Sequence, residues 1–159
     1  MKLLTVSALL CAMMAMSTDA VCSHRGCPYG WTRIYRRCFL FVPRAMNWAA
    51  AERNCLSMGG NLASVHSSRE YHLIQRLTAR YGKGVTWIGG TDASGEAVWL
   101  WSDGSRFRYR HWCRGEPNNG RGRQHCLQIN YSGSKCWDDQ YCHVRRPSIC
   151  ARKIFTCRG

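Results

Sequence analysis

Three of the nine acidic residues lie in two short segments that could bind a cation together. These segments, Glu116-Pro117-Asn118 and Trp137-Asp138-Asp139, each follow shortly after a cysteine, Cys113 and Cys136 respectively. If those two cysteines pair, the disulfide brings both segments together. The three carboxylates and the amides of Asn118 and Gln124 would then be hard oxygen ligands of the kind that calcium prefers. Without that pairing they would be separate solvated turn residues, as most loop Asp and Asn residues are.

Other chemistries find less support in the residue types. The sequence contains neither a Gly-x-Ser-x-Gly elbow nor a His-Glu-x-x-His motif, and we predict no enzyme. Eleven cysteines in 159 residues indicate an oxidising compartment and disulfide bonds. A zinc site is conceivable, but disulfides explain the same cysteines more simply. The residues that such a site could draw on are Cys113, His125, Cys126, Cys142 and His143.

The first twenty residues have the pattern of a signal peptide. Lys2 is followed by an apolar run over residues 3–16, and Thr18-Asp19-Ala20 offers small residues for cleavage. This run is shorter than the roughly 20 residues of a membrane-spanning helix. We therefore predict a signal peptide over 1–20 and a secreted, extracellular domain over 21–159, without membrane insertion.

The chain is strongly basic, with 23 Lys+Arg against 9 Asp+Glu and a formal net charge of +14. Cleavage after Ala20 removes Lys2 and Asp19 together, so this charge persists, and it removes Cys11, which leaves an even number of cysteines. Arginine favours sulfate, phosphate and carboxylate groups. For a secreted chain, acidic glycans or anionic microbial surfaces are better partners than nucleic acid, which we do not expect.

Hydrophobic spacing predicts one α+β domain. Apolar residues recur at helical spacing over 46–58, and a second helix is predicted from Ser67, with Glu70 completing a capping box, to Gly82. Residues 106–124 show little periodicity, which predicts a long loop that Trp112 and Cys113 pin to the domain. Strands are predicted within 21–42 and over 85–90, 97–101, 126–131, 135–137 and 148–153.

An ordered set of motifs between about Cys27 and Lys153 resembles the C-type lectin-like domain. Within that family the chain is most similar to secreted fish lectins of the ladderlectin and type II antifreeze group, as Cys113 and Cys136 suggest. The resemblance implies two helices packed on short antiparallel sheets, a long ligand-binding loop and several disulfides. The motifs are Cys27-Pro28-Tyr29-Gly30-Trp31, the Trp48…Cys55 helix, Trp87-Ile88-Gly89-Gly90, Trp99-Leu100-Trp101-Ser102-Asp103-Gly104-Ser105, Glu116-Pro117-Asn118 and Cys136-Trp137-Asp138-Asp139.

The disulfide pattern follows from this resemblance, because ten cysteines alone leave the connectivity open. The last two cysteines, Cys22 and Cys157, are paired here because the termini of this fold lie side by side, with an interchain bridge as the alternative. The pairs that the family and its subgroup imply are Cys27–Cys38, Cys55–Cys150, Cys126–Cys142 and Cys113–Cys136.

The resemblance also implies one calcium ion, Ca²⁺, at the long loop. Glu116, Asn118 and Asp139 match the family's ligands, whereas Gln124 stands where a Glu is expected and Asp138 where an Asn is expected. The exchange keeps three carboxylates and two amides. Glu116, Asn118, Gln124 and Asp138 are then the expected carbohydrate-binding residues, because ligand amides donate to vicinal sugar hydroxyls and ligand carboxylates accept from them. Glu-Pro-Asn implies mannose-type sugars, and the exchange leaves the exact sugar open.

A second calcium site of the family would use Asp92, Glu96, residue 119, Gln124 and the residue that is His125 here. We interpret that site as degraded. His125 is more simply an exposed neutral histidine.

The leading hypothesis is a secreted calcium-dependent lectin that binds mannose-type or acidic microbial glycans in innate defence. The alternative is a domain that has lost sugar binding and holds polyanions through arginine, with Arg110, Arg114, Arg121 and Arg123 beside the loop. An antifreeze-like or venom protein is a weaker alternative. Single domains of this kind bind one sugar weakly, so avidity would require clustering, and a homo-oligomer is possible.

Overall fold

The computed structural model describes residues 26–82 and 84–154, so the signal peptide and the Cys22–Cys157 pair lie outside the described residues. Within these ranges the helices are α1 (Trp48–Ser57) and α2 (Ser68–Ala79), with a short 3₁₀ turn, η1, at Gly120–Gly122. The strands are β1 (Thr32–Ile34), β2 (Arg37–Met46), β3 (Asn61–Leu62), β4 (Thr86–Thr91), β5 (Leu100–Trp101), β6 (Cys126–Tyr131), β7 (Cys136–Gln140) and β8 (Arg146–Lys153).

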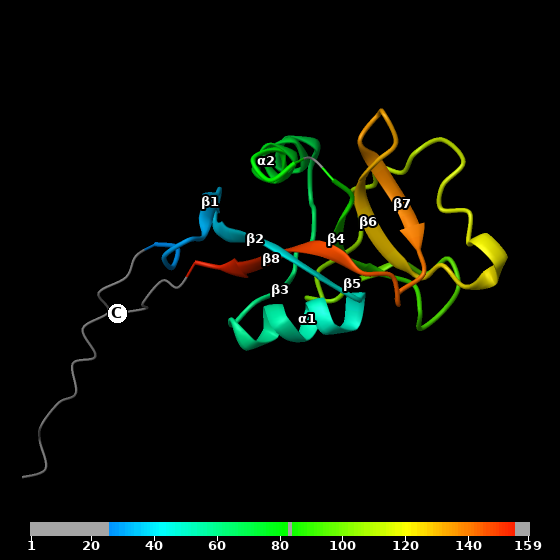
Figure 1. Ribbon diagram of the computed structural model, residues 1–159, viewed down its shortest axis with the longest axis horizontal. Helices are drawn as coiled ribbons and strands as arrows, with labels where there is room; N and C mark the ends of the chain where they lie inside the picture. The colour runs from blue at the N-terminus through cyan, green and yellow to red at the C-terminus, as the bar shows by residue number, and fades with distance from the viewer. Residues whose placement is uncertain (1–25, 83, 155–159) are drawn as a thin grey trace, which may run out of the picture.

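The strands form one mixed sheet in the order β1-β2-β8-β4-β6-β7, with β3 on β8 and β5 on β4. The pairing of β4 with β8 is parallel and the other strand pairs are antiparallel. Helices α1 and α2 lie on opposite sides of the central strands (Figure 1). Strand β1 and the start of β2 stand at one end of the molecule, and the loop that precedes β6 stands at the other, beside β7 (Figure 1). This is the α+β architecture that the sequence predicts.

Both helices begin directly after a polar residue whose side chain caps the helix N-terminus. The side chain of Asn47 accepts a hydrogen bond from the amide of Ala50 (2.8 Å), and Ser67 accepts one from Glu70 (3.2 Å). The second helix differs from the predicted capping box, because the Glu70 carboxylate accepts from the amide of His66 rather than Ser67. It also ends earlier than predicted, at Ala79, so that Tyr81 lies beyond it and is exposed.

Strand β3 was not predicted, β5 is shorter than the predicted 97–101, and β2 and β7 extend beyond their predicted ends. Strand β2 continues through Pro43 to Met46, where its pairing with β8 is interrupted between Val42 and Met46. A proline fits there because that irregularity does not require its missing N–H group. Strand β7 extends to Gln140, so Asp138 and Asp139 belong to a strand and not to a turn after it.

An aromatic cluster fixes the long loop to the sheet. The buried ring of Trp137 makes edge-on contacts with Trp101, Phe107 and Trp112, at centroid distances of 5.7, 6.0 and 5.8 Å. The backbones of Trp112 and Trp137 form a parallel bridge. These contacts hold the start of the loop and bring it next to Asp138 and Asp139.

Four disulfides join the pairs that the family resemblance implies. The pair Cys113–Cys136 connects the long loop to the first residue of β7, 23 residues further along the chain. This disulfide therefore holds the segment that contains Glu116 next to the strand that contains Asp139.

Across residues 26–82 and 84–154, no helix combines the length and apolar character needed to cross a bilayer.

Candidate functional site

The structure brings three predicted ligands together at the end of β7. Glu116, Asp138 and Asp139 each offer one carboxylate oxygen, and these oxygens lie within 4.8 Å of one another. Asp138 and Asp139 are buried, and Glu116 is partly exposed at the mouth of the site. We call these three residues the loop cluster. Three carboxylates at such distances repel one another unless a proton or a cation lies among them.

Asp139 holds the loop in place. Its two carboxylate oxygens accept from the backbone amides of Asn118 (3.0 Å) and Asn119 (2.8 Å). Each carboxylate oxygen has a second lone pair, so these bonds leave Asp139 able to coordinate an ion. The side chain therefore fixes the loop backbone and is available as a ligand.

A chain of hydrogen-bonded polar residues on the neighbouring strands orients Asp138. The amide of Gln128 on β6 donates to Asp138 (2.6 Å), and its carbonyl oxygen accepts from Arg146 on β8 (3.2 Å). Gln128 is 1% exposed, so this chain runs through the sheet. It balances part of the charge of Asp138 without placing a cation in the loop cluster.

Glu116 and Asn118 flank a proline whose peptide bond is cis, the isomer that the family pattern has at this position. The Asn118 amide donates to Oε1 of Glu116 (2.9 Å). The other oxygen, Oε2, is buried and has no hydrogen-bond partner within residues 26–82 and 84–154. Buried carboxylate oxygens are normally satisfied, so Oε2 is a site at which a cation fits.

Burial and closely spaced carboxyl groups shift the pKa values of Glu116 and Asp138. Burial, together with the neighbouring carboxyls of Asp139 and Asp138, raises the pKa of Glu116 to about 7. Burial also raises the pKa of Asp138, with a further contribution from Asp139 and against the hydrogen bond from Gln128. The folded chain thus concentrates negative charge that water does not stabilise fully.

No lysine or arginine forms an ion pair with the loop cluster among the described residues, and only Arg146 is near enough to lower the pKa of Asp138. The ion pairs found in residues 26–82 and 84–154 are Arg37 with Glu70, and His125 with Asp92 and Glu96. The charge of the three clustered carboxylates is therefore offset only in part. The donor set of hard oxygens fits calcium.

The fifth predicted ligand, Gln124, is positioned inside the loop. Its side-chain oxygen Oε1 accepts from the backbone N–H of Gly120, and its backbone N–H donates to Oδ1 of Asn119 (3.1 Å). A side chain at Gly120 would collide with the oxygen of Gln124 and approach that of Asn118. The two amide oxygens therefore lie next to the same glycine, although that of Gln124 is already bonded within the loop.

Sequence reasoning missed the residues that support the ligands. Asn119 has a left-handed backbone, which asparagine tolerates, and its side chain fixes Gln124. Gln128 and Arg146 orient Asp138 from two other strands. The one sequence feature that could have indicated this support is a glutamine within the apolar strand 126–131. The sequence does not reveal that its partner is Asp138.

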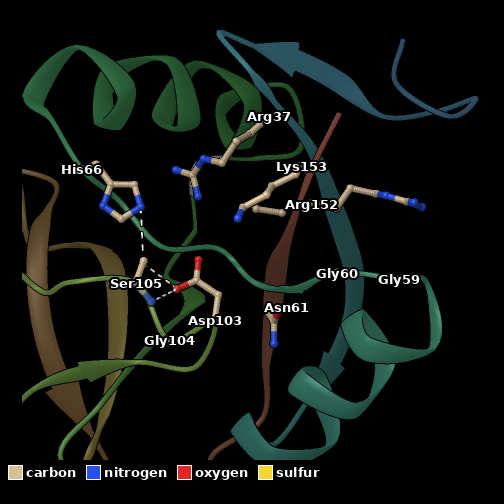
Figure 2. A pocket seen from close by; sticks show the side chains of 11 residues that line it. Arg37, Gly59, Gly60, Asn61, His66, Asp103, Gly104, Ser105, Arg152 and Lys153 are labelled. Atoms are coloured by element: carbon tan, nitrogen blue, oxygen red, sulfur yellow. Dashed lines mark hydrogen bonds between the residues drawn. The ribbon is translucent and has the colours of Figure 1, made fainter. Parts of the chain in front are cut away.

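A basic cavity of about 530 Å³ lies between α1 and the ends of β2 and β8. Figure 2 shows Arg37 and Lys153 on one side of it and His66, Asp103 and Ser105 on the other. Arg37 and Lys153 also line a neighbouring cavity of about 520 Å³, with Arg33, Arg36 and Ile154. We call Arg33, Arg36, Arg37, Arg152 and Lys153 the basic groove.

The loop arginines that the sequence suggested are also at the surface. Arg110, Arg114, Arg121 and Arg123 are all exposed. They remain available to an anionic ligand, but no cavity given above is lined by them.

The sheet joined by disulfides, the long loop and the loop cluster define a C-type lectin fold. The chain belongs to that family, because residues 44–152 match the lectin C-type domain. Ladderlectin of Oncorhynchus mykiss is 41% identical, with 93% of this chain and 92% of that protein covered. The galactose-specific lectin nattectin of Thalassophryne nattereri is 43% identical over 80% of this chain and 81% of its own length.

Solved structures agree with this assignment. Herring type II antifreeze protein has a TM-score of 0.77 and 37% identity, and the match covers 81% of this chain and 100% of that one. Both calcium-independent and Ca²⁺-dependent type II antifreeze proteins occur among the structural neighbours. Membership of the family therefore does not by itself decide whether a chain uses calcium.

Proposed function

We propose that this chain is a secreted, calcium-dependent lectin whose ion binds at the loop cluster. The observation that supports it is the meeting of Glu116, Asp138 and Asp139 with no lysine or arginine in an ion pair with them among the described residues. The relatives that are lectins by name support the same class of function.

Glu116, Asn118, Asp138 and Asp139 would hold the ion, with Gln124 as a fifth ligand after its carbonyl oxygen leaves the Gly120 amide. When bound, calcium supplies a positive centre that coordinates two neighbouring hydroxyl oxygens of a sugar. Asp139 anchors the loop through the amides of Asn118 and Asn119. This anchoring reduces the ordering that binding would otherwise require.

The ligand side chains would also contact the sugar hydroxyls. Asn118 now donates to Glu116, and both groups would exchange that bond for bonds to a sugar hydroxyl. Such a hydroxyl both donates and accepts, so an acceptor next to a donor recognises a vicinal diol. We propose a mannose-type diol from the Glu116-Asn118 pair, whereas the name of nattectin points to galactose as the competitor.

Affinity chromatography of the full-length secreted protein tests the proposal. We expect retention on immobilised mannan in calcium and release by a chelator, with weaker retention on immobilised galactose. Glu116→Gln should abolish retention, and Glu96→Gln, a matched change outside the loop cluster, should not. Retention that survives the chelator would contradict the proposal. Stronger retention on galactose would keep the calcium mechanism and overturn the mannose assignment.

A second candidate function rests on the basic groove. Its two cavities share Arg37 and Lys153, and their linings carry five arginine and lysine residues against one carboxylate, Asp103. Arginine binds sulfate or carboxylate with two parallel hydrogen bonds. The surface fits a sulfated polysaccharide, and such binding would not require calcium.

Retention on heparin distinguishes the two functions. The double variant Arg36→Gln/Lys153→Gln should elute at clearly lower salt than the parent chain, because exposed charges are screened. Arg110→Gln/Arg114→Gln removes the same charge beside the long loop and should change elution less. Equal shifts in both double variants would show a diffuse effect of net charge and would overturn the groove as a specific site.

A further inference from the structure

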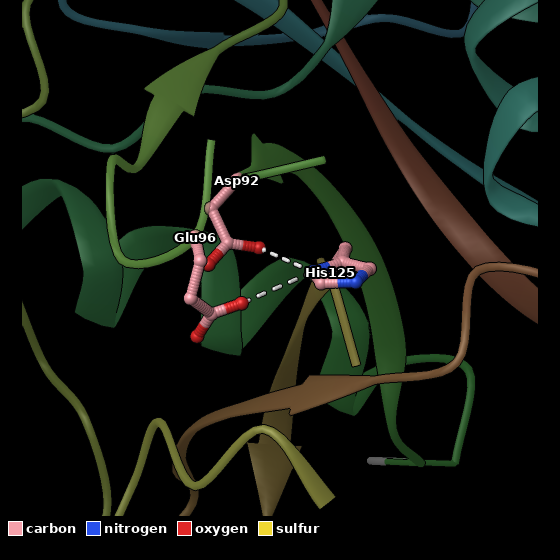
Figure 3. A group of neighbouring side chains, drawn as sticks. All are labelled: Asp92, Glu96 and His125. Carbon is pink, nitrogen blue, oxygen red and sulfur yellow. Dashed lines mark hydrogen bonds and ion pairs between the residues drawn. The ribbon is translucent and has the colours of Figure 1, made fainter. Parts of the chain in front are cut away.

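A second cluster of metal-ligating side chains lies outside the loop cluster. Asp92 and Glu96 belong to the turn after β4, and His125 immediately precedes β6; we call these three residues the turn cluster. Figure 3 shows both carboxylates directed at the histidine ring. His125 Nδ1 lies 3.0 Å from an oxygen of Asp92 and 3.7 Å from an oxygen of Glu96. Asp92 is 2% exposed, so its charge is almost fully removed from water.

The backbone holds the turn cluster in this arrangement. The carbonyl oxygen of His125 accepts from the hydroxyl of Thr91 (2.7 Å) and the amide of Asp92 (3.2 Å). The second carboxylate oxygen of Asp92 accepts from the amide of Ala97 (2.9 Å), which leaves the first oxygen directed at His125. Cys126, next to His125, is fixed by its disulfide to Cys142. Such supporting bonds fix the orientation of metal ligands in proteins.

The turn cluster occupies the position of the family's second calcium site, but its donors do not fit calcium. Calcium requires six to eight oxygens. Among the described residues the turn cluster supplies only two carboxylates, those of Asp92 and Glu96. His125 contributes a nitrogen instead of an oxygen. One nitrogen and two carboxylates are the donor set of a borderline transition ion.

We propose that Asp92, Glu96 and His125 form a binding site for zinc in place of that second calcium. Zinc binds three protein ligands and keeps a fourth position for water, with bonds of about 2.0 to 2.2 Å. Tetrahedral geometry with such bonds separates neighbouring ligand atoms by about 3.3 to 3.6 Å. The separations of 3.0 and 3.7 Å from His125 lie on either side of that range, and all three ligand atoms lie within 4.8 Å of one another, so side-chain adjustments would complete the site.

The competing explanation is an ion pair, in which a protonated His125 neutralises the two carboxylates. Calorimetric zinc titration of the full-length secreted protein, without a polyhistidine tag, distinguishes the two. Excess calcium is present throughout, so that the loop cluster is occupied if it binds calcium. We expect one zinc per chain, with affinity reduced on the order of 100-fold in His125→Gln through loss of a ligand. His143→Gln removes an exposed histidine elsewhere and should leave the affinity unchanged.

Glu96→Gln provides a second test that does not threaten the fold. The Glu96 side chain is 56% exposed, so folding should tolerate the change while zinc binding weakens about tenfold. Cobalt provides an independent readout, since its visible absorption spectrum should appear in the parent chain and disappear in His125→Gln. Zinc binding that is equal in the parent and His125→Gln, or that calcium displaces, would overturn the proposal. A failure of calcium binding at the loop cluster would leave these results unchanged, so the two proposals fail separately.

Discussion

The loop cluster and the turn cluster both gather carboxylates at the edge of one sheet, but they differ in their third donor. The loop cluster has three carboxylates, and burial with carboxyl neighbours raises the pKa of Glu116 to about 7. The turn cluster has one buried carboxylate, Asp92, one exposed carboxylate, Glu96, and the imidazole of His125. This difference in donor atoms distinguishes an oxygen site for calcium from a mixed site for a transition ion.

The strongest test of this contrast is Asp139→Asn. Asp139 is fully buried and its two oxygens hold two loop amides. The substitution removes a ligand and one of those acceptors together, so we expect calcium affinity to fall on the order of 100-fold or more. Calcium titration measures this. Zinc binding at the turn cluster should persist, and its equal loss would show that the two clusters are not independent.

Removing the Cys113–Cys136 disulfide should affect one cluster more than the other. The bond closes a loop with a sequence separation of 23 residues, so its removal should lower the free energy of unfolding by ~3 kcal/mol. The double variant Cys113→Ser/Cys136→Ser, measured by urea denaturation, tests this. Its calcium affinity should fall about tenfold because Glu116 and Asp139 are no longer covalently coupled. Unchanged calcium affinity would mean that the aromatic contacts of Trp137 suffice to order the loop.

Calcium binding should depend on pH through Glu116. A carboxyl with a pKa of about 7 carries a proton that calcium must displace, so affinity should fall about tenfold for each pH unit below 7. The metal-free fold should behave oppositely. Folding raises this pKa above its ordinary value of 4.5, so stability is greatest below that value and is lost as the pH rises through 7. Calcium titrations and thermal melts over that window check both signs, and Glu116→Gln should weaken the pH dependence of the metal-free melts, with the contribution of Asp138 remaining.

The smallest expected change in calcium affinity comes from restoring the residues that the family has at positions 124 and 138. The double variant Gln124→Glu/Asp138→Asn keeps the number of carboxylates and amides, so calcium affinity should change by less than about tenfold. The order of donors and acceptors around one sugar hydroxyl is reversed. Competition by mannose and galactose should therefore shift relative to the parent chain. A large loss of calcium affinity with no shift in preference would show that Gln128 requires a carboxylate at 138.

The sequence predicted the parts of the fold that depend on local pattern. The helix start at Ser67 follows from its capping pattern, and periodicity predicted the first helix over 46–58, which begins at Trp48 instead. The pinned loop follows from Trp112 and Cys113. The family motifs added the disulfide pairs, which cysteine spacing alone leaves open.

The remainder depends on contacts between distant segments. The Gln128–Arg146 chain behind Asp138 joins β6 to β8, and no local pattern encodes that pairing. His125 looked like an exposed neutral histidine, because the turn containing Asp92 is 33 residues away in sequence. The family resemblance grouped it with Asp92 and Glu96, and the pairing of β4 with β6 shows the contact itself.

Isothermal titration of the metal-free protein with calcium tests whether the loop cluster is a calcium site. We expect one calcium ion per chain, lost in Glu116→Gln and retained in His125→Gln. No calcium uptake by the parent chain at millimolar concentration, or loss of uptake in His125→Gln instead of Glu116→Gln, would contradict it.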